Sequence, residues 1–317
     1  MTQILVFLAP PRSFTSVVAA MCGRHPQMYG LAETHLFGAD TVSEWWRQCS
    51  VATFDMDHGL RRVVAELFFG GQTEITVSRA TGWLHRRGHF TTGLIFEEVT
   101  KKVYPRIPVD KSPSTVYWLE SMQRIYSMFP QARFVHLVRH PRGHGESVIR
   151  YLNERIKLGP LPPKYWLLCL AACPSLSVKD LQTGHYDSEI DPQRGWYALH
   201  KNICEFLKSV PEEQKLRIRS EELLTDREQG LLRVATWLGL RTDPEAIEEM
   251  RHPERSPYAC YGPPGATLGN DRFFLRSPAL RPERAGLHTL DGPLGWREDG
   301  QGFLPEVKKL AMIFGYK

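Results

Sequence analysis

The sequence predicts an α/β protein, with a central parallel sheet flanked by helices in three layers, as in P-loop proteins. A continuous apolar run, typical of a strand buried on both faces, occurs at 4–9, a second such strand is expected at 132–139, and a helical pattern follows each. The composition, 42% hydrophobic and 24% charged, is that of an ordinary globular protein. We expect one domain over residues 1–317, with an irregular, flap-like segment rich in Gly, Pro and Arg at 253–303.

Strands and helices alternate along the chain. A helix at 15–22 follows the first apolar run, and the helix after the second run has an apolar face that includes Val148 and Leu152. The later elements are a helix at 195–210, a strand at 215–220 and a helix at 227–240 that is closed by Gly239. Strands separated by helices indicate a parallel sheet with helices on both faces.

The charge balance favours a small anionic ligand. The formal net charge is +5 and the basic residues are scattered, which argues against a nucleic-acid partner. The six cysteines include no CxxC pair, so we expect reduced thiols in a cytoplasmic protein. The apolar run at 4–9 is too short for a signal peptide or a membrane span, and we expect neither.

The turn after the first strand has the chemistry of an anion site. The segment Pro-Arg-Ser-Phe-Thr-Ser (11–16) enters a helix directly, so backbone N–H groups, the helix dipole, hydroxyls and a guanidinium converge there. The alternative is that Arg12 and Ser13 only cap the helix. The residues expected to bind an anion are Arg12, Ser13, Phe14, Thr15, Ser16 and Val17.

A second anion site is expected after the second strand. Arg139 follows that strand directly, and Ser147 lies eight residues further on. At the mouth of a neighbouring parallel strand, a guanidinium and a hydroxyl can share one anionic group. Two such sites at adjacent strand ends imply a ligand with phosphates at both ends, such as a dinucleotide-like molecule.

These motifs resemble those of sulfotransferases that use 3′-phosphoadenosine 5′-phosphosulfate (PAPS). PRSFTS resembles their 5′-phosphosulfate loop, P-[KR]-S-G-T-[ST], and FVHLVRHPRGHGES resembles their 3′-phosphate motif. VDKSPSTVYW (109–118) resembles the DK[ST]P segment of bacterial members. The resemblance runs from residue 4 to about 240 and is closest to sulfotransferase domains of polyketide assembly lines, through Glu-Thr-His at 33–35 and His-Lys-Asn-Ile at 200–203.

The resemblance implies an enzyme that transfers a sulfuryl group from PAPS to a hydroxyl, or less readily an amine, of a small acceptor. The acceptor would be a polyketide, a lipid or another secondary metabolite, free or bound to a carrier protein, and no metal would be required. Arg12 would face the leaving 5′-phosphate, and Lys111 would be a second cation or a proton donor at the bridging oxygen.

The acceptor hydroxyl needs a base. His200 is the expected base, with Glu33 second and His35 as a further candidate. For His200 the alternative is a core histidine on a helix face, and for Glu33 and His35 it is a solvated loop.

Two positions depart from the family pattern. Phe14 stands where the loop normally has glycine, so the backbone there is expected to avoid positive φ. Ser220 stands where the family places a tyrosine that contacts adenine, so stacking on the base must come from another residue. Within the flap, residues 260–274 form a loop from which Asn270 or Arg272 is expected to reach the ligand on closure. The alternative is a structural surface loop.

Two other classes of function stay open at this stage. One is a P-loop kinase or another nucleotide phosphotransferase, which is disfavoured because the chain has no GxxxxGK[ST] loop and no evident magnesium carboxylate. The other is a non-catalytic module that keeps the fold to bind a nucleotide.

Overall fold

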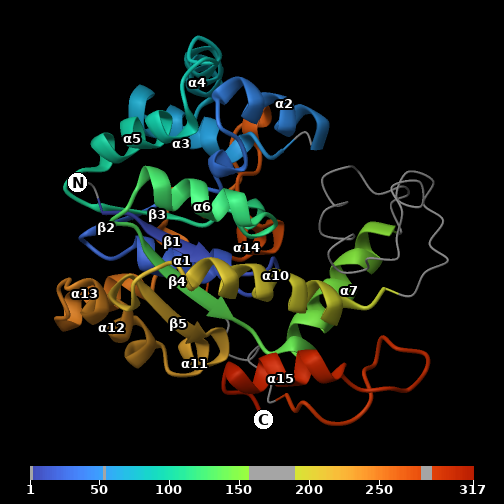
Figure 1. Ribbon diagram of the computed structural model, residues 1–317. Coiled ribbons are helices and arrows are strands. Elements are labelled where there is room, and N and C mark those ends of the chain that lie inside the picture. Colours follow the sequence, from blue (N-terminus) through green and yellow to red (C-terminus); the bar gives the residue numbers. More distant parts are fainter. Residues whose placement is uncertain (1–2, 53–54, 157–189, 280–287) are drawn as a thin grey trace.

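A five-stranded, all-parallel sheet forms the centre of the computed structural model (Figure 1). The structure describes residues 3–52, 55–156, 190–279 and 288–317. The strand order is β2-β3-β1-β4-β5, and the predicted class is confirmed. The strands are β1 (Leu5–Leu8), β2 (Met28–Gly30), β3 (Ile107–Asp110), β4 (Arg133–Val138) and β5 (Lys215–Arg219).

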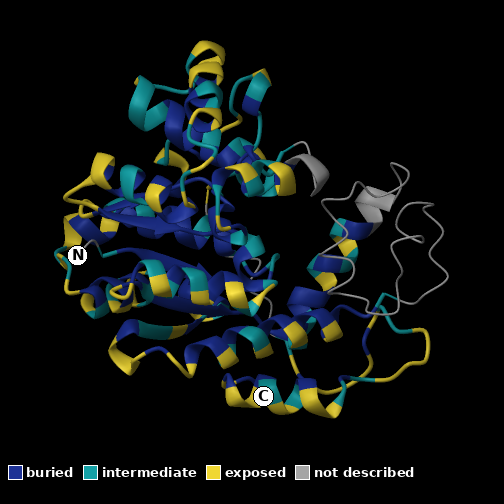
Figure 2. Cartoon of the chain, turned by 45° about the horizontal axis from the view of Figure 1, so that its top comes forward, coloured by how far each residue is buried: buried dark blue, intermediate teal, exposed yellow. Residues whose placement is uncertain are grey.

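Alternate residues of β1 enter two different cores, because successive side chains of a strand point to opposite faces. Val6 and Leu8 pack with residues of α6 (Leu119–Met128) and α10 (Pro192–Leu207). Leu5 and Phe7 pack with the other layer, which contains α1 (Thr15–Gly23), α12 (Arg227–Leu238) and α13 (Pro244–Met250). β1 is therefore buried on both faces, as its apolar run predicts, and Figure 2 shows the sheet as the buried centre of the molecule.

A group of helices lies between β2 and β3 in the chain and forms the upper part of Figure 1. The sequence patterns do not predict the bounds of these helices, or of β2 and β3 on either side of them. Thr73 and Thr91 cap two of the helices by accepting hydrogen bonds from backbone N–H groups. The helices are α2 (Val42–Ala52), α3 (His58–Phe69), α4 (Glu74–His85) and α5 (Thr92–Val103).

The helices predicted after the strands are present. α7 (Pro141–Ile156) follows β4, and α12 ends at Gly239, which has the left-handed conformation of a C-terminal cap, with φ 69°. The other α-helices of the described residues are α11 (Ser220–Thr225), α14 (Arg272–Arg276) and α15 (Pro305–Ile313). No helix in these described ranges is long and apolar enough to cross a membrane.

Residues 253–279 pack against α3, and the contact is centred on Arg62, a residue of α3 whose side chain is fully buried. Its Nη1 donates to the Leu268 carbonyl at 2.7 Å, and its Nε donates to Gln72 at 2.6 Å. Tyr258 is also fully buried. In this structure the segment is therefore fastened to the body of the protein just before it reaches the candidate site.

Candidate functional site

The loop between β1 and α1 has left-handed backbone at two residues. Arg12 has φ 71° and Phe14 has φ 61°, so the expectation that Phe14 avoids positive φ is wrong. The chain keeps the bend that a glycine would make without strain, and the Phe14 ring packs 4.1 Å from the Arg139 guanidinium. Ser13 is fully buried and its hydroxyl has no hydrogen-bond partner.

The two predicted anion sites are in contact. β1 and β4 pair in parallel, so the residues after them share one edge of the sheet. Arg139 Nη1 donates to the Arg12 carbonyl at 2.5 Å, and Arg12 Nε donates to Ser147 Oγ at 3.3 Å. Burial lowers the pKa of Arg139 to about 10, despite the nearby Glu221 carboxylate. A guanidinium this buried fits a site that receives an anion.

Lys111 connects this loop to the end of β2. Its ammonium donates to Ser16 Oγ at 2.9 Å, forms an ion pair with Glu33 and lies 3.3 Å from Asn270 Oδ1. His35 Nε2 lies 3.5 Å from the second oxygen of Glu33. We call Lys111, Glu33, His35, Ser16 and Asn270 the Lys111 cluster.

The charges of this cluster hold Glu33 ionised. Burial by itself would raise the pKa of the Glu33 carboxyl, but the Lys111 ammonium and His35 outweigh it and lower the pKa to about 2. The Glu33 side chain is 15% exposed. Glu33 is thus a carboxylate at neutral pH that remains open to a ligand.

A buried network joins the ends of β2 and β3 below the cluster. Asp110 Oδ1 accepts from Thr34 Oγ1 at 2.8 Å, and Ser112 Oγ accepts from the His35 backbone N–H at 3.0 Å. Ser114 Oγ lies 2.8 Å from His35 Nδ1. His35 itself is left-handed, with φ 51°. These contacts explain how the segments Glu-Thr-His and Asp-Lys-Ser-Pro, far apart in sequence, act as one unit.

His200 lies in a different environment. It is fully buried on α10, and its Nδ1 is 2.9 Å from His136 Nε2. The rings of Trp196 and Phe314 pack against it, with centroids 4.6 and 5.1 Å away. Burial lowers the pKa of His200 well below its usual value. We call His136, Trp196, His200 and Phe314 the His200 cluster.

This burial argues against the expectation that His200 is the base. A general base must come within hydrogen-bond distance of the proton that it accepts, and His200 has no exposed surface. The structure does not bring it into contact with the Lys111 cluster. The alternative of a core histidine fits its surroundings better, although its Nε2 has no hydrogen-bond partner.

Asp271 is a further residue of the site that the sequence motifs do not indicate. Its carboxylate forms an ion pair with Arg12, whose guanidinium also lies over the rings of Phe273 and Tyr151, at 4.9 and 5.3 Å. Asn270 touches the predicted Lys111, whereas Arg272 lies 3.6 Å from Asp55. A carboxylate directly before a short helix is an ordinary cap in sequence, so only the fold reveals its second contact.

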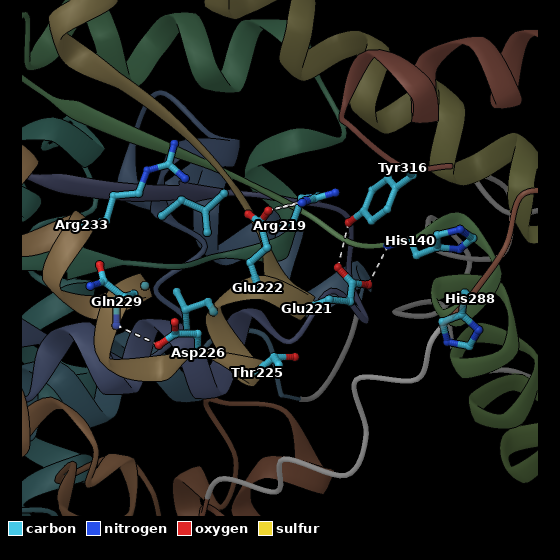
Figure 3. Close-up of a pocket in the computed structure, with 13 residues that line it drawn as sticks. His140, Arg219, Glu221, Glu222, Thr225, Asp226, Gln229, Arg233, His288 and Tyr316 are labelled. Atoms are coloured by element: carbon cyan, nitrogen blue, oxygen red, sulfur yellow. Dashed lines mark hydrogen bonds and ion pairs between the residues drawn. The ribbon is translucent and has the colours of Figure 1, made fainter.

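A cavity of about 700 Å³ lies beside the carboxyl end of β5 (Figure 3). The residues that line the cavity include His140, which directly follows Arg139 in the chain, and also Leu223, Arg233 and Tyr316. Ser220 is absent from this lining because it is fully buried and donates to the Val138 carbonyl at 3.0 Å.

Within the described ranges, no group of three or more His, Cys, Asp or Glu side chains is arranged to hold a metal ion.

Comparisons with known proteins agree with the motifs. Residues 5–157 match the model of a family described as "Sulfotransferase family". This match confirms the predicted resemblance to sulfotransferases. A comparison with curated protein sequences finds no match.

Two solved structures resemble the whole chain. One is the sulfotransferase domain from the curacin biosynthetic pathway, with 20% identity, a TM-score of 0.75 and coverage of 100% of this chain and 99% of that chain. The other is the sulfotransferase domain from the Synechococcus PCC 7002 olefin synthase, with 22% identity, a TM-score of 0.69 and coverage of 100% of this chain and 95% of that chain. The protein therefore has the sulfotransferase fold.

Proposed function

We propose that this protein is a sulfotransferase that moves a sulfuryl group from PAPS to a hydroxyl of a small acceptor, with Glu33 as the base. The observation that carries the proposal is the position of Lys111. One ammonium contacts Ser16 of the phosphate loop and Glu33 at the end of β2. It therefore stands between the predicted donor site and the carboxylate that would receive the acceptor proton.

The loop and its two arginines suit the phosphates of PAPS. Ser13 has a buried hydroxyl without a partner, and such a group is costly unless a ligand satisfies it. Arg12 and Lys111 would stabilise charge on the leaving 5′-phosphate, and each such donor is worth about 3 kcal/mol in the transition state. Arg139 and Ser147 would hold the 3′-phosphate. PAPS supplies the activated sulfuryl group.

The reaction would be an in-line displacement. The acceptor oxygen forms a bond to sulfur while the bond between sulfur and the bridging oxygen of the 5′-phosphate breaks, and its electron pair stays on the phosphate. The Glu33 carboxylate takes the proton of the acceptor hydroxyl. The products are the sulfated acceptor and 3′-phosphoadenosine 5′-phosphate (PAP).

The ion pair with Lys111 regulates the strength of this base. While the ammonium faces Glu33, the carboxyl has a pKa of about 2 and is a weak base. The Lys111 ammonium already contacts both Ser16 and Glu33. A phosphate bound at Ser16 would therefore draw the ammonium toward the loop and away from Glu33. Loss of its positive partner raises the pKa of a buried carboxylate, so donor binding would strengthen the base.

The nucleoside has room in the cavity beside His140. If Arg139 binds the 3′-phosphate, the adenosine can continue past His140 toward Leu223 and Tyr316. The Tyr316 ring offers aromatic surface to the base, at a site where the family's tyrosine is replaced by Ser220.

The two similar domains support the proposed class of acceptor. They come from the curacin biosynthetic pathway and from an olefin synthase, which favours a polyketide, lipid or related secondary metabolite, free or bound to a carrier protein. We also propose that the protein is cytoplasmic, because the sequence predicts reduced thiols.

Turnover of labelled PAPS with a pool of hydroxylated acceptors tests the proposal. We expect label to move to an acceptor without added metal. Calorimetric titration should give tight binding of PAP and weak binding of ATP, whereas a magnesium-dependent preference for ATP would favour a phosphotransferase. PAP binding without any turnover would favour the non-catalytic module.

The variant Arg139→Ala tests the site of the 3′-phosphate. The dissociation constant of PAP should rise by about 100-fold, because a desolvated phosphate would lose its partner. Arg194→Ala, which removes an exposed arginine of α10, is the matched control. Equal affinity of both variants would remove Arg139 from the site.

A further inference from the structure

The Asp271 carboxylate forms an ion pair with Arg12, the residue proposed above to bind the 5′-phosphate. One of its oxygens pairs with Arg12 Nη1, and the other accepts from the backbone N–H groups of Phe273 and Phe274 at 2.9 and 3.2 Å. The carboxylate is thus oriented by the first turn of α14. It supplies a fixed negative charge at a place that should receive a negatively charged ligand.

Arg12 has little freedom to leave this partner. Its Nε donates to Ser147, and the rings of Phe273 and Tyr151 lie beside its guanidinium. The Arg12 side chain is 16% exposed and that of Asp271 is 28% exposed. A charge pair in such a partly buried place is screened less by water than a pair on the open surface.

The residues before Asp271 are anchored by their backbone. The Gly269 carbonyl accepts from the Glu33 backbone N–H at 2.8 Å, and the Leu268 N–H donates to His58 Nδ1 at 3.2 Å. A Cβ on Gly269 would lie 2.8 Å from the Gly59 Cα, which shows how closely this segment meets α3. The chain is therefore held in place at residues 268–269, two positions before the Asp271 carboxylate that pairs with Arg12.

We propose that Asp271 is an internal competitor of the donor for Arg12. The proposal rests on the function proposed above, and it adds a residue that sets the affinity of the same site. In the free protein the carboxylate is the counter-ion of Arg12, and the 5′-phosphate of the donor displaces it on binding. The phosphate must displace the Asp271 carboxylate, because two anions at one guanidinium repel each other. This displacement lowers the net binding free energy of the phosphate at Arg12. The product PAP is then held less tightly and released more readily.

The opposite role predicts the opposite sign. If Asp271 only positioned Arg12 for the phosphate, its removal would leave the guanidinium disordered and would weaken binding of the phosphate. If Asp271 competes, removal of its charge strengthens binding. The two roles are therefore separated by a measurement of affinity.

The test compares Asp271→Asn with the unmodified protein by calorimetric titration of PAP and of inorganic pyrophosphate. Asparagine caps helices well, so the contacts with Phe273 and Phe274 are kept while the charge is removed. We expect the dissociation constants of both ligands to fall by about 10-fold. Thermal unfolding verifies that the variant folds, and Asp271→Ser, which also caps without charge, is the substitute if it does not.

The matched control is Asp243→Asn. Asp243 also caps a short helix, through Ala246 N at 3.2 Å, and also pairs with an arginine, Arg241, at 2.8 Å. It lies outside the candidate site, so the control should leave both affinities unchanged. Equal or weaker binding in Asp271→Asn would overturn the competition. If Asp271→Asn bound pyrophosphate more tightly but did not bind PAP, Asp271 would still be a competitor for Arg12, and PAPS would be rejected as the donor.

Discussion

The Lys111 cluster and the His200 cluster both contain a predicted base, yet they are built in opposite ways. In the Lys111 cluster, charged groups neutralise one another and Glu33 stays partly exposed. In the His200 cluster, neutral rings pack together and His200 has no exposed surface. Motif residues of the right chemical type are therefore catalytic candidates only where the fold leaves them open to a ligand.

Backbone strain differs between the two clusters in the same way. Among the described residues, the non-glycine residues with positive φ are Arg12, Phe14 and His35. His35 belongs to the Lys111 cluster, and Arg12 and Phe14 shape the adjoining loop between β1 and α1. Strain of this kind persists when the surrounding contacts enforce it, and it concentrates at functional sites. The strained backbone thus points to the same place as the charges.

The largest expected effect is on turnover in Glu33→Gln. The amide keeps the size of the side chain but cannot accept the acceptor proton, so kcat should fall by about 1,000-fold. PAP affinity should not fall, because the residues proposed to bind the phosphates remain and the Lys111 ammonium loses the carboxylate that competes with the phosphate. Single-turnover measurement with labelled PAPS and titration of PAP give the two numbers.

The control for this variant comes from the other cluster. His200→Leu removes the buried pair with His136 and should lower the stability, while the turnover of the folded fraction stays within a few-fold of normal. If His200→Leu lost turnover and Glu33→Gln kept it, the roles of the two clusters would be reversed.

A smaller effect is expected on stability below neutral pH. Burial lowers the pKa of His140 and of His144 to about 3, whereas in the unfolded chain each would titrate near 6.5. The unfolded chain therefore binds more protons below pH 6.5, and the folded state loses stability there. Each of these two histidines should contribute a loss of about 1 kcal/mol between pH 7 and 5.5, and His136 and His200 act in the same direction.

Asp110 partly offsets this loss, because burial raises its pKa to about 6 and the folded state takes up a proton there first. Urea unfolding at the two pH values measures the net change. In His144→Gln the pH dependence of the unfolding free energy should be flatter by about 1 kcal/mol. A stability that rises toward pH 5.5 would contradict the neutral state of the buried histidines.

The sequence predicted a parallel sheet with strands β1, β4 and β5, and an anion-binding loop after β1, because those signals are local. An apolar run before PRSFTS, and another before Arg139, can be read within a few residues. The surroundings of His200 could not be predicted, since Phe314 reaches it from more than one hundred positions away in the chain. Asp271 meets Arg12 across 259 positions, and no pattern in either segment announces that contact.

The smallest expected effect tests the strain itself, at Phe14. Both Phe14→Ala and Phe14→Gly remove the ring that packs 4.1 Å from the Arg139 guanidinium, so both should be less stable than the natural protein. Alanine keeps the cost of left-handed backbone, and glycine does not. The glycine variant should therefore be more stable than the alanine variant by about 1 kcal/mol in urea unfolding.

The same pair of substitutions at Val17, inside α1, provides the control for this difference. In a regular helix glycine is less favourable than alanine by about 1 kcal/mol, so the order of the two variants should be reversed there. If glycine were also the less stable choice at Phe14, the left-handed turn would carry no strain. The phosphate loop would then not differ in backbone strain from the unstrained helix that carries His200, and the contrast between the two regions would rest on charge and exposure alone.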